Sequence, residues 1–112
     1  MSGGFLYVLE LSNGSVKVGR TSNLRVRVAA HRKNFRRAGL SIEKQSSFHT
    51  VFDIGLCEAR LIDDIRLTGA TRVTREVFSG ISYEVACECA ASAAEYRFFS
   101  NDPPAPTPEK AV

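Results

Sequence analysis

The sequence predicts an α/β (α+β) domain in which a small three-stranded, largely antiparallel sheet is flanked by helices. Three observations carry this prediction: a β-rich N-terminal segment with a turn signal, amphipathic helical patterns farther along, and a length suited to one modest core. The chain has 112 residues, of which 44% are apolar. The expected order is strand, strand, helix, strand, helix, an optional short strand, and helix.

The N-terminal segment predicts a β-hairpin. Residues 5–11 and 15–19 are β-rich, and the Ser-Asn-Gly between them is a turn signal. A two-residue turn would put Tyr7 and Lys17 on opposite faces of the hairpin. A three-residue loop, with its glycine in the left-handed position of a bulge, pairs Tyr7 with Gly19 and places Tyr7, Lys17 and Gly19 on one face. We favour the three-residue loop.

Residues 24–38 predict an amphipathic helix, with Thr-Ser-Asn before it as capping residues and Gly39 after its end. The spacing of its apolar side defines a buried stripe of Leu24, Val28, His31 and Phe35. Arg27 and His31 lie four residues apart along one edge of this stripe. The opposite edge carries Arg25, Arg32 and Arg36. Both margins of the helix are therefore basic.

The remainder of the chain predicts one strand, two helices and a connecting segment. Alternating apolar residues indicate a strand at 46–52. A helix is expected at 56–67, and an alanine-rich helix at 82–96. Between the two helices, residues 71–78 form a connection that is in part extended and carries Glu76. The first of these helices is expected to bury Cys57, Leu61 and Ile65.

Residues 1–99 are expected to form one domain, and residues 100–112 a Pro-rich tail. The tail holds all four prolines of the chain, which cannot join a helix or a strand ladder, so we expect it to be disordered.

Composition excludes several classes of protein. No apolar run approaches the roughly 20 residues that span a bilayer, and the first residues do not resemble a secretory signal. We therefore expect a soluble, cytoplasmic protein of prokaryotic or phage-like origin with no membrane partner. Cys57, Cys87 and Cys89 have the spacing of neither a disulfide framework nor a zinc site, and are interpreted as incidental thiols.

Positive charge is concentrated in the first part of the chain. Residues 1–40 hold eight Lys or Arg and one acid, whereas residues 41–112 hold seven Lys or Arg and eleven acids. Such an asymmetry indicates one face suited to a polyanion, although a solvated basic helix would give the same count.

Four segments occur in the order typical of a known nuclease superfamily: Gly4-Phe5-Leu6-Tyr7, then Lys17-Val18-Gly19-Arg20-Thr21, then Leu24-Arg25-Val26-Arg27 with His31, and finally Thr74-Arg75-Glu76-Val77-Phe78. Together they resemble the GIY-YIG nuclease superfamily, and within it the phage-type branch whose second motif commonly reads Lys-Ile-Gly-Arg-Thr. Each motif alone is weak evidence. Their ordered combination covers about residues 4–95 and makes the resemblance specific.

The resemblance implies a GIY-YIG-like fold and a role for each matched residue in the hairpin. Tyr7 matches the tyrosine of the first motif, which is implied to help deprotonate the attacking water. Lys17 stands where the family's second tyrosine often stands. Gly19 matches the last glycine of the second motif.

The resemblance also implies roles for residues outside the hairpin. Arg27 matches the helical arginine that holds the scissile phosphate, and His31 matches the histidine one turn farther on. Glu76 matches the acidic residue that binds the divalent metal. The implied activity is a metal-dependent endonuclease that hydrolyses phosphodiester bonds in DNA, with Mg²⁺ or Mn²⁺ as cofactor.

Elementary chemistry is compatible with these implied roles. Arg27 offers a permanent, fork-shaped donor for phosphate. One carboxylate such as Glu76, completed by water and phosphate oxygens, suits Mg²⁺. Tyrosine has an ordinary pKa near 10, so Tyr7 can act as a base at neutral pH only if its pKa is depressed. We expect Lys17 or Arg27 to depress it by favouring the phenolate.

The chain departs from the family pattern at three places. The first motif reads Phe-Leu-Tyr rather than Gly-Ile-Tyr, Lys17 replaces an aromatic hydroxyl, and Val77 stands where a tryptophan is expected. The last departure weakens the assignment of Glu76, for which Glu58 or Glu84 is the fallback metal ligand.

The expected partner is DNA, with RNA as an alternative. The residues expected to contact nucleic acid are Arg20, Arg25, Arg32, Lys33, Arg36 and Arg37. Specificity would come from a homodimer, from substrate structure or from a partner protein. A competing interpretation is a non-catalytic nucleic-acid-binding module with a degenerate nuclease fold. A third is a protein-interaction adaptor that uses the Pro-rich tail.

Overall fold

The computed structural model describes residues 3–95, so the predicted tail at 100–112 and the end of the predicted last helix lie outside the described residues. The described elements are β1 (Gly4–Leu11), β2 (Val16–Thr21), α1 (Leu24–Arg37), β3 (Ile42–Thr50), α2 (Ile54–Leu67), β4 (Thr71–Thr74), β5 (Val77–Ser79) and α3 (Tyr83–Ala94). This is the α+β class that the sequence predicts.

The sheet has five antiparallel strands in the order β3-β1-β2-β5-β4, so the prediction of three strands is wrong. The segment at 71–78 supplies the two extra strands as a short hairpin. β4 is exposed throughout and β5 has only three residues, so neither is long and buried enough to mark a strand in sequence.

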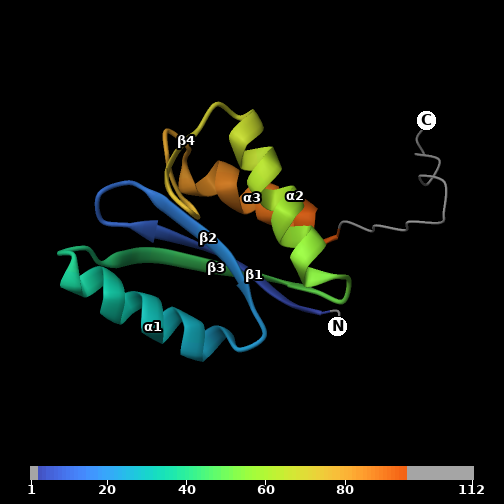
Figure 1. Ribbon diagram of the computed structural model, residues 1–112, viewed down its shortest axis with the longest axis horizontal. Coiled ribbons are helices and arrows are strands. Elements are labelled where there is room, and N and C mark those ends of the chain that lie inside the picture. The colour runs from blue at the N-terminus through green and yellow to red at the C-terminus, as the bar shows by residue number, and fades with distance from the viewer. Residues whose placement is uncertain (1–2, 96–112) are drawn as a thin grey trace.

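Helices cover both faces of the sheet (Figure 1). α2 and α3 pack on one face, where Leu6, Val8, Val16 and Val18 meet buried residues of both helices in the larger core. α1 packs on the other face, where the smaller core consists of Tyr7, Leu9 and Val28, with half-buried Leu24, Phe35 and Ile42 around it. Neighbouring residues of a strand contribute to different cores, because successive side chains point to opposite faces of the sheet.

The hairpin between β1 and β2 has the predicted three-residue loop. The Leu11 amide donates to the Ser15 carbonyl over 2.9 Å, and Gly14 adopts a φ of +89°, which the missing side chain of glycine permits. The register pairs Tyr7 with Gly19. Tyr7 and Gly19 consequently face α1, as does Lys17.

The boundaries of the remaining elements follow local capping. Asn23, Asp53 and Ser82 each accept a backbone N–H bond at the start of α1, α2 and α3, and the Asp53 cap starts α2 two residues earlier than predicted. β3 occupies residues 42–50 rather than 46–52, because its pairing with β1 extends past the alternating apolar residues.

Among residues 3–95, no helix combines the length and apolar character needed to cross a membrane.

Candidate active site

Tyr7 lies directly across Gly19 on the face of the sheet covered by α1. Its side chain is 1% exposed. A Cβ atom added at Gly19 would overlap the Tyr7 hydroxyl and stand 2.6 Å from Cζ of the ring. The glycine is therefore needed for close approach, since any side chain there would occupy the position of the phenol.

The hydroxyl of Tyr7 bonds to Nε2 of His31 over 2.7 Å. Burial, followed by the positive charges of Lys17 and Arg27, lowers the pKa of His31 from its ordinary value. His31 is thus neutral near pH 7, and Tyr7 is protonated. It follows that the Tyr7 hydroxyl donates and Nε2 accepts, with the imidazole proton on Nδ1. His31 in turn stacks on Phe35.

The prediction that the pKa of Tyr7 is depressed is wrong for the protein as the structure describes it. Burial raises the pKa of Tyr7 to about 12, and the interaction with the guanidinium of Arg27 lowers it only in part. The negative charges of Glu76 and Glu58 add to the rise. Desolvation outweighs the single cation that was expected to dominate.

Arg27 lies on α1, one turn before His31, and its side chain is exposed. Its guanidinium interacts with the Tyr7 hydroxyl and lowers the pKa of Tyr7, and its charge also lowers the pKa of His31. Because the guanidinium is exposed, it can contact a phosphate from solvent without any rearrangement of α1.

Lys17 and Glu76 form an ion pair at the edge of the site, with Nζ 2.9 Å from Oε1. Glu76 lies in the turn between β4 and β5, and its carbonyl accepts the Val18 amide of β2 over 3.0 Å. Burial alone would raise the pKa of Glu76, but the hydrogen bond and charge of Lys17 outweigh it and leave that pKa below its usual value. The carboxylate is therefore ionised.

Glu58 of α2 lies near the same site from the opposite face of the sheet. Burial and the charge of Glu76 raise the pKa of Glu58, while Arg20 opposes the rise. Glu58 pairs with Arg20 of β2, with 3.0 Å between Oε1 and Nε. Neither the separation of these residues in sequence nor any motif indicated this pair, so sequence reasoning missed it.

Other predicted residues lie away from this site. Glu84, the second fallback metal ligand, is on α3 and pairs with Lys44 of β3. Arg32 bonds to Gln45 of β3 over 3.4 Å, on the margin of α1 opposite Arg27. The basic residues of α1 predicted to contact nucleic acid are all exposed: Arg25, Arg32, Lys33, Arg36 and Arg37.

Glu76 is the ionised carboxylate of this site that could hold a divalent metal ion. Lys17 engages Oε1 of the carboxylate, and Glu58 is close enough for the two carboxylates to influence each other. In residues 3–95, no three His, Cys, Asp or Glu side chains group as metal ligands. An ion here would take most of its ligands from water and phosphate, which is the usual arrangement for Mg²⁺.

The structure thus brings together Tyr7, Lys17, Gly19, Arg27, His31 and Glu76, here named the Tyr7 cluster. A family model described as the T5orf172 domain matches residues 4–101, which contain the whole cluster. Comparison with the curated proteins and with the solved structures gives no match.

Proposed function

The chain belongs to the T5orf172 domain family, and on that premise we propose that it is a metal-dependent endonuclease of the GIY-YIG type that hydrolyses phosphodiester bonds in DNA. Domains of this family are associated with nuclease-like proteins of phages and mobile elements. The proposal rests on chemistry at the Tyr7 cluster.

One observation carries the proposal: six residues from four different places in the chain converge at one site. Tyr7 comes from β1, Lys17 and Gly19 from β2, Arg27 and His31 from α1, and Glu76 from the β4–β5 turn. The Tyr7–His31 hydrogen bond and the Lys17–Glu76 ion pair hold four of them together. A purely structural core would not collect two cations, an anion and a hydrogen-bonded phenol–imidazole pair in this way.

Phosphodiester hydrolysis requires that water lose a proton as its oxygen attacks phosphorus. The Tyr7 hydroxyl donates a hydrogen bond to His31 and interacts with the Arg27 guanidinium, which leaves one lone pair of its oxygen to accept a hydrogen bond from the attacking water. As the new P–O bond forms, the water proton passes to the Tyr7 oxygen, and the Tyr7 proton passes to Nε2 of His31. This relay needs no stable phenolate, which the raised pKa of Tyr7 disfavours.

The transition state places additional negative charge on the phosphoryl oxygens. Arg27 is positioned to bind them through its guanidinium, next to the Tyr7 hydroxyl. Lys17 contributes a second positive charge and holds Glu76 in place. The P–O bond to the leaving oxygen then breaks, that oxygen takes up a proton from solvent water, and His31 returns its extra proton to solvent.

Glu76 is the residue proposed to hold the metal ion. When bound, Mg²⁺ or Mn²⁺ would neutralise charge on the phosphate and the leaving oxygen. Glu58, the first fallback metal ligand, forms an ion pair with Arg20. Glu84, the second, is exposed and pairs with Lys44 away from the Tyr7 cluster, so neither is preferred to Glu76 as the metal ligand.

The proposed substrate is DNA, and RNA is the alternative that the test must separate. The exposed basic residues of α1 extend the positive surface beyond Arg27, as binding to a phosphate backbone requires. A homodimer or a partner protein would supply specificity, since the charged residues of the Tyr7 cluster are assigned here to the phosphate and the metal rather than to the bases.

A second candidate function is a nucleic-acid-binding module that does not cleave. The raised pKa of Tyr7 favours it, because a protonated, buried phenol is a weak base. Such a module would use the basic surface of α1 and would not depend on Glu76.

The decisive experiment is a cleavage assay with Mg²⁺ or Mn²⁺ on plasmid DNA, single-stranded DNA and RNA. Arg27→Ala and Glu76→Ala should each abolish cleavage while the circular dichroism spectrum is retained. Glu84→Ala is the matched control, because that exposed carboxylate pairs with a lysine outside the site. Binding without cleavage in any metal would support the non-catalytic module, and full activity of Glu76→Ala would exclude Glu76 as metal ligand.

A further inference from the structure

β5 pairs with only a short part of β2 and leaves the rest of that edge open. The paired residues are Val16 and Lys17, and the last contact is the Val18 amide to the Glu76 carbonyl. From Gly19 to Thr21, no strand of the described residues lies beside β2 on this side. The Tyr7 cluster therefore borders a stretch of sheet edge that no strand of the described residues covers.

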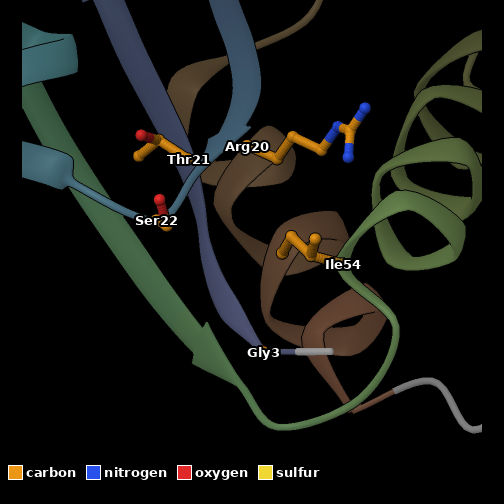
Figure 2. Close-up of a pocket in the computed structure, with 5 residues that line it drawn as sticks. All are labelled: Gly3, Arg20, Thr21, Ser22 and Ile54. Carbon is orange, nitrogen blue, oxygen red and sulfur yellow. The ribbon is translucent and has the colours of Figure 1, made fainter. Parts of the chain in front are cut away.

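Arg20 lies on this open stretch, on the opposite face of the sheet from Arg27. Its position in β2 alternates with Gly19, so its side chain projects toward α2 (Figure 2). There its Nε contacts Glu58, whose side chain is 14% exposed, while that of Arg20 is 52% exposed. A partly buried carboxylate thus holds an accessible guanidinium.

The contact with Glu58 involves the Nε atom of the Arg20 guanidinium. Arginine has five N–H donors in a planar fork, and the ion pair runs through Nε. The terminal nitrogens, which form bidentate contacts with phosphate, belong to a side chain that is 52% exposed. The Arg20 residue also lines a pocket of about 290 Å³, together with Gly3, Thr21, Ser22 and Ile54 (Figure 2).

Glu58 links Arg20 electrostatically to the Tyr7 cluster. The charges of Glu58 and Glu76 influence each other, and Glu58 also affects the pKa of Tyr7. Through its contact with Glu58, Arg20 is therefore coupled to the site at which the scissile phosphate is proposed to bind. A strand that crosses the open edge would meet Arg27 on one face and Arg20 on the other.

We propose that Arg20 forms a second phosphate-binding subsite for the nucleotide next to the scissile phosphate, and that Glu58 is the positioning residue that orients Arg20. This inference rests on the proposed nucleic-acid substrate. In this proposal Glu58 orients the Arg20 side chain and does not bind a metal ion. The alternative is that the pair only ties β2 to α2.

The first test measures binding of a fluorescent duplex oligonucleotide, without divalent metal, at several salt concentrations. Loss of one phosphate contact should reduce the slope of log K against log salt by about 0.9, and we expect this for Arg20→Gln. Lys44→Gln is the matched control: its side chain is 53% exposed and pairs with Glu84 at the far end of the sheet. Equal slopes for Arg20→Gln and wild type, or no binding by wild type, would overturn the subsite.

The second test is a double-mutant cycle on the dissociation constant. If Glu58 positions Arg20, Arg20→Gln should weaken binding at least two-fold more in the wild-type background than in Glu58→Gln. If the two substitutions show no coupling, the ion pair only connects β2 to α2. Coupling of the opposite sign would mean that Glu58 competes with the ligand for Arg20. Either result refutes the positioning role.

Because neither binding test requires cleavage, the two proposals fail separately. A protein that binds with the expected slope change but never cuts refutes the nuclease and retains the subsite. A protein that cuts while Arg20→Gln binds with an unchanged slope refutes the subsite alone.

Discussion

At the scale of single residues, the hydroxyl of Tyr7 is the most constrained polar group of the site. It is enclosed by Gly19, bonded to His31 and influenced by Arg27. We expect Tyr7→Phe to reduce the cleavage rate by about 10²- to 10⁴-fold, the usual contribution of proton transfer by a side chain. Tyr83→Phe, which removes a phenol bonded to Ser46 outside the site, should cleave like wild type. Equal rates for both variants would refute the relay.

The Tyr7–His31 hydrogen bond also predicts a dependence on pH. Because the pKa of His31 is lowered in the folded protein, the unfolded chain takes up more protons below about pH 6.5. The contribution of His31 to stability is therefore present above that pH and is lost as the pH falls through the lower folded pKa. Cleavage should decline in the same direction, since protonated Nε2 cannot accept the Tyr7 proton. A rate profile without an acid limb, measured beside His31→Gln, would contradict this.

Gly19 predicts a steric effect. Gly19→Ala would force Cβ into the ring of Tyr7, and overpacking of this kind costs about 1–3 kcal/mol. The expected result is a Tm lower by several degrees, together with loss of cleavage. Thermal unfolding measured by circular dichroism checks the first part, and a wild-type Tm would show that Tyr7 can move aside.

The sequence motifs predicted which residues would lie near one another in the candidate site, but not the electrostatic states of those residues. Motif order placed Tyr7, Arg27 and Glu76 together because each occupies a fixed position in a recognisable segment. The direction of the pKa shift of Tyr7 depends on how much α1 and the sheet desolvate it, and no linear pattern encodes that quantity. The Arg20–Glu58 pair was missed for the same reason, since it depends on how α2 sits on the sheet.

At the scale of elements, the two faces of the sheet are packed unequally. α2 buries Cys57, Leu61 and Ile65, whereas Val28 is the one buried residue of α1. We expect Leu61→Ala to lower the free energy of unfolding by about 2–5 kcal/mol and Val28→Ala to lower it by less. Amide hydrogen exchange should also show α1 opening at lower free energy than α2. Equal protection of the two helices would contradict this difference.

The sequence predicted the longer elements well and the short ones poorly. α1 and α2 have caps and apolar periodicity that can be recognised directly. β4 and β5 form because the turn at Arg75–Glu76 folds the segment back on itself and β2 offers an unpaired edge. That edge belongs to another part of the chain, so local patterning could not reveal it.

At the scale of the whole molecule, the excess of positive charge in the first part of the chain forms an exposed basic surface on α1. The net charge is +3, and α1 displays most of the basic residues of the first part of the chain. We expect Arg36→Gln to raise the dissociation constant for DNA and to reduce its salt dependence. Arg66→Gln is the control, since this exposed arginine also lies in the last turn of a helix, α2. If both variants weaken binding equally, net charge rather than the surface of α1 determines affinity.

Because the loop between β1 and β2 sets the strand register, the site depends on whether residues are inserted into or deleted from this loop in odd or even numbers. Removing one loop residue would shift the pairing so that Lys17 and Gly19 turn away from Tyr7, because side chains alternate along a strand. Adding two residues to the native loop would leave the alternation unchanged. Substitutions in this loop can thus accumulate during evolution far more freely than single-residue insertions or deletions, and homologues that retain the site should differ there in steps of two.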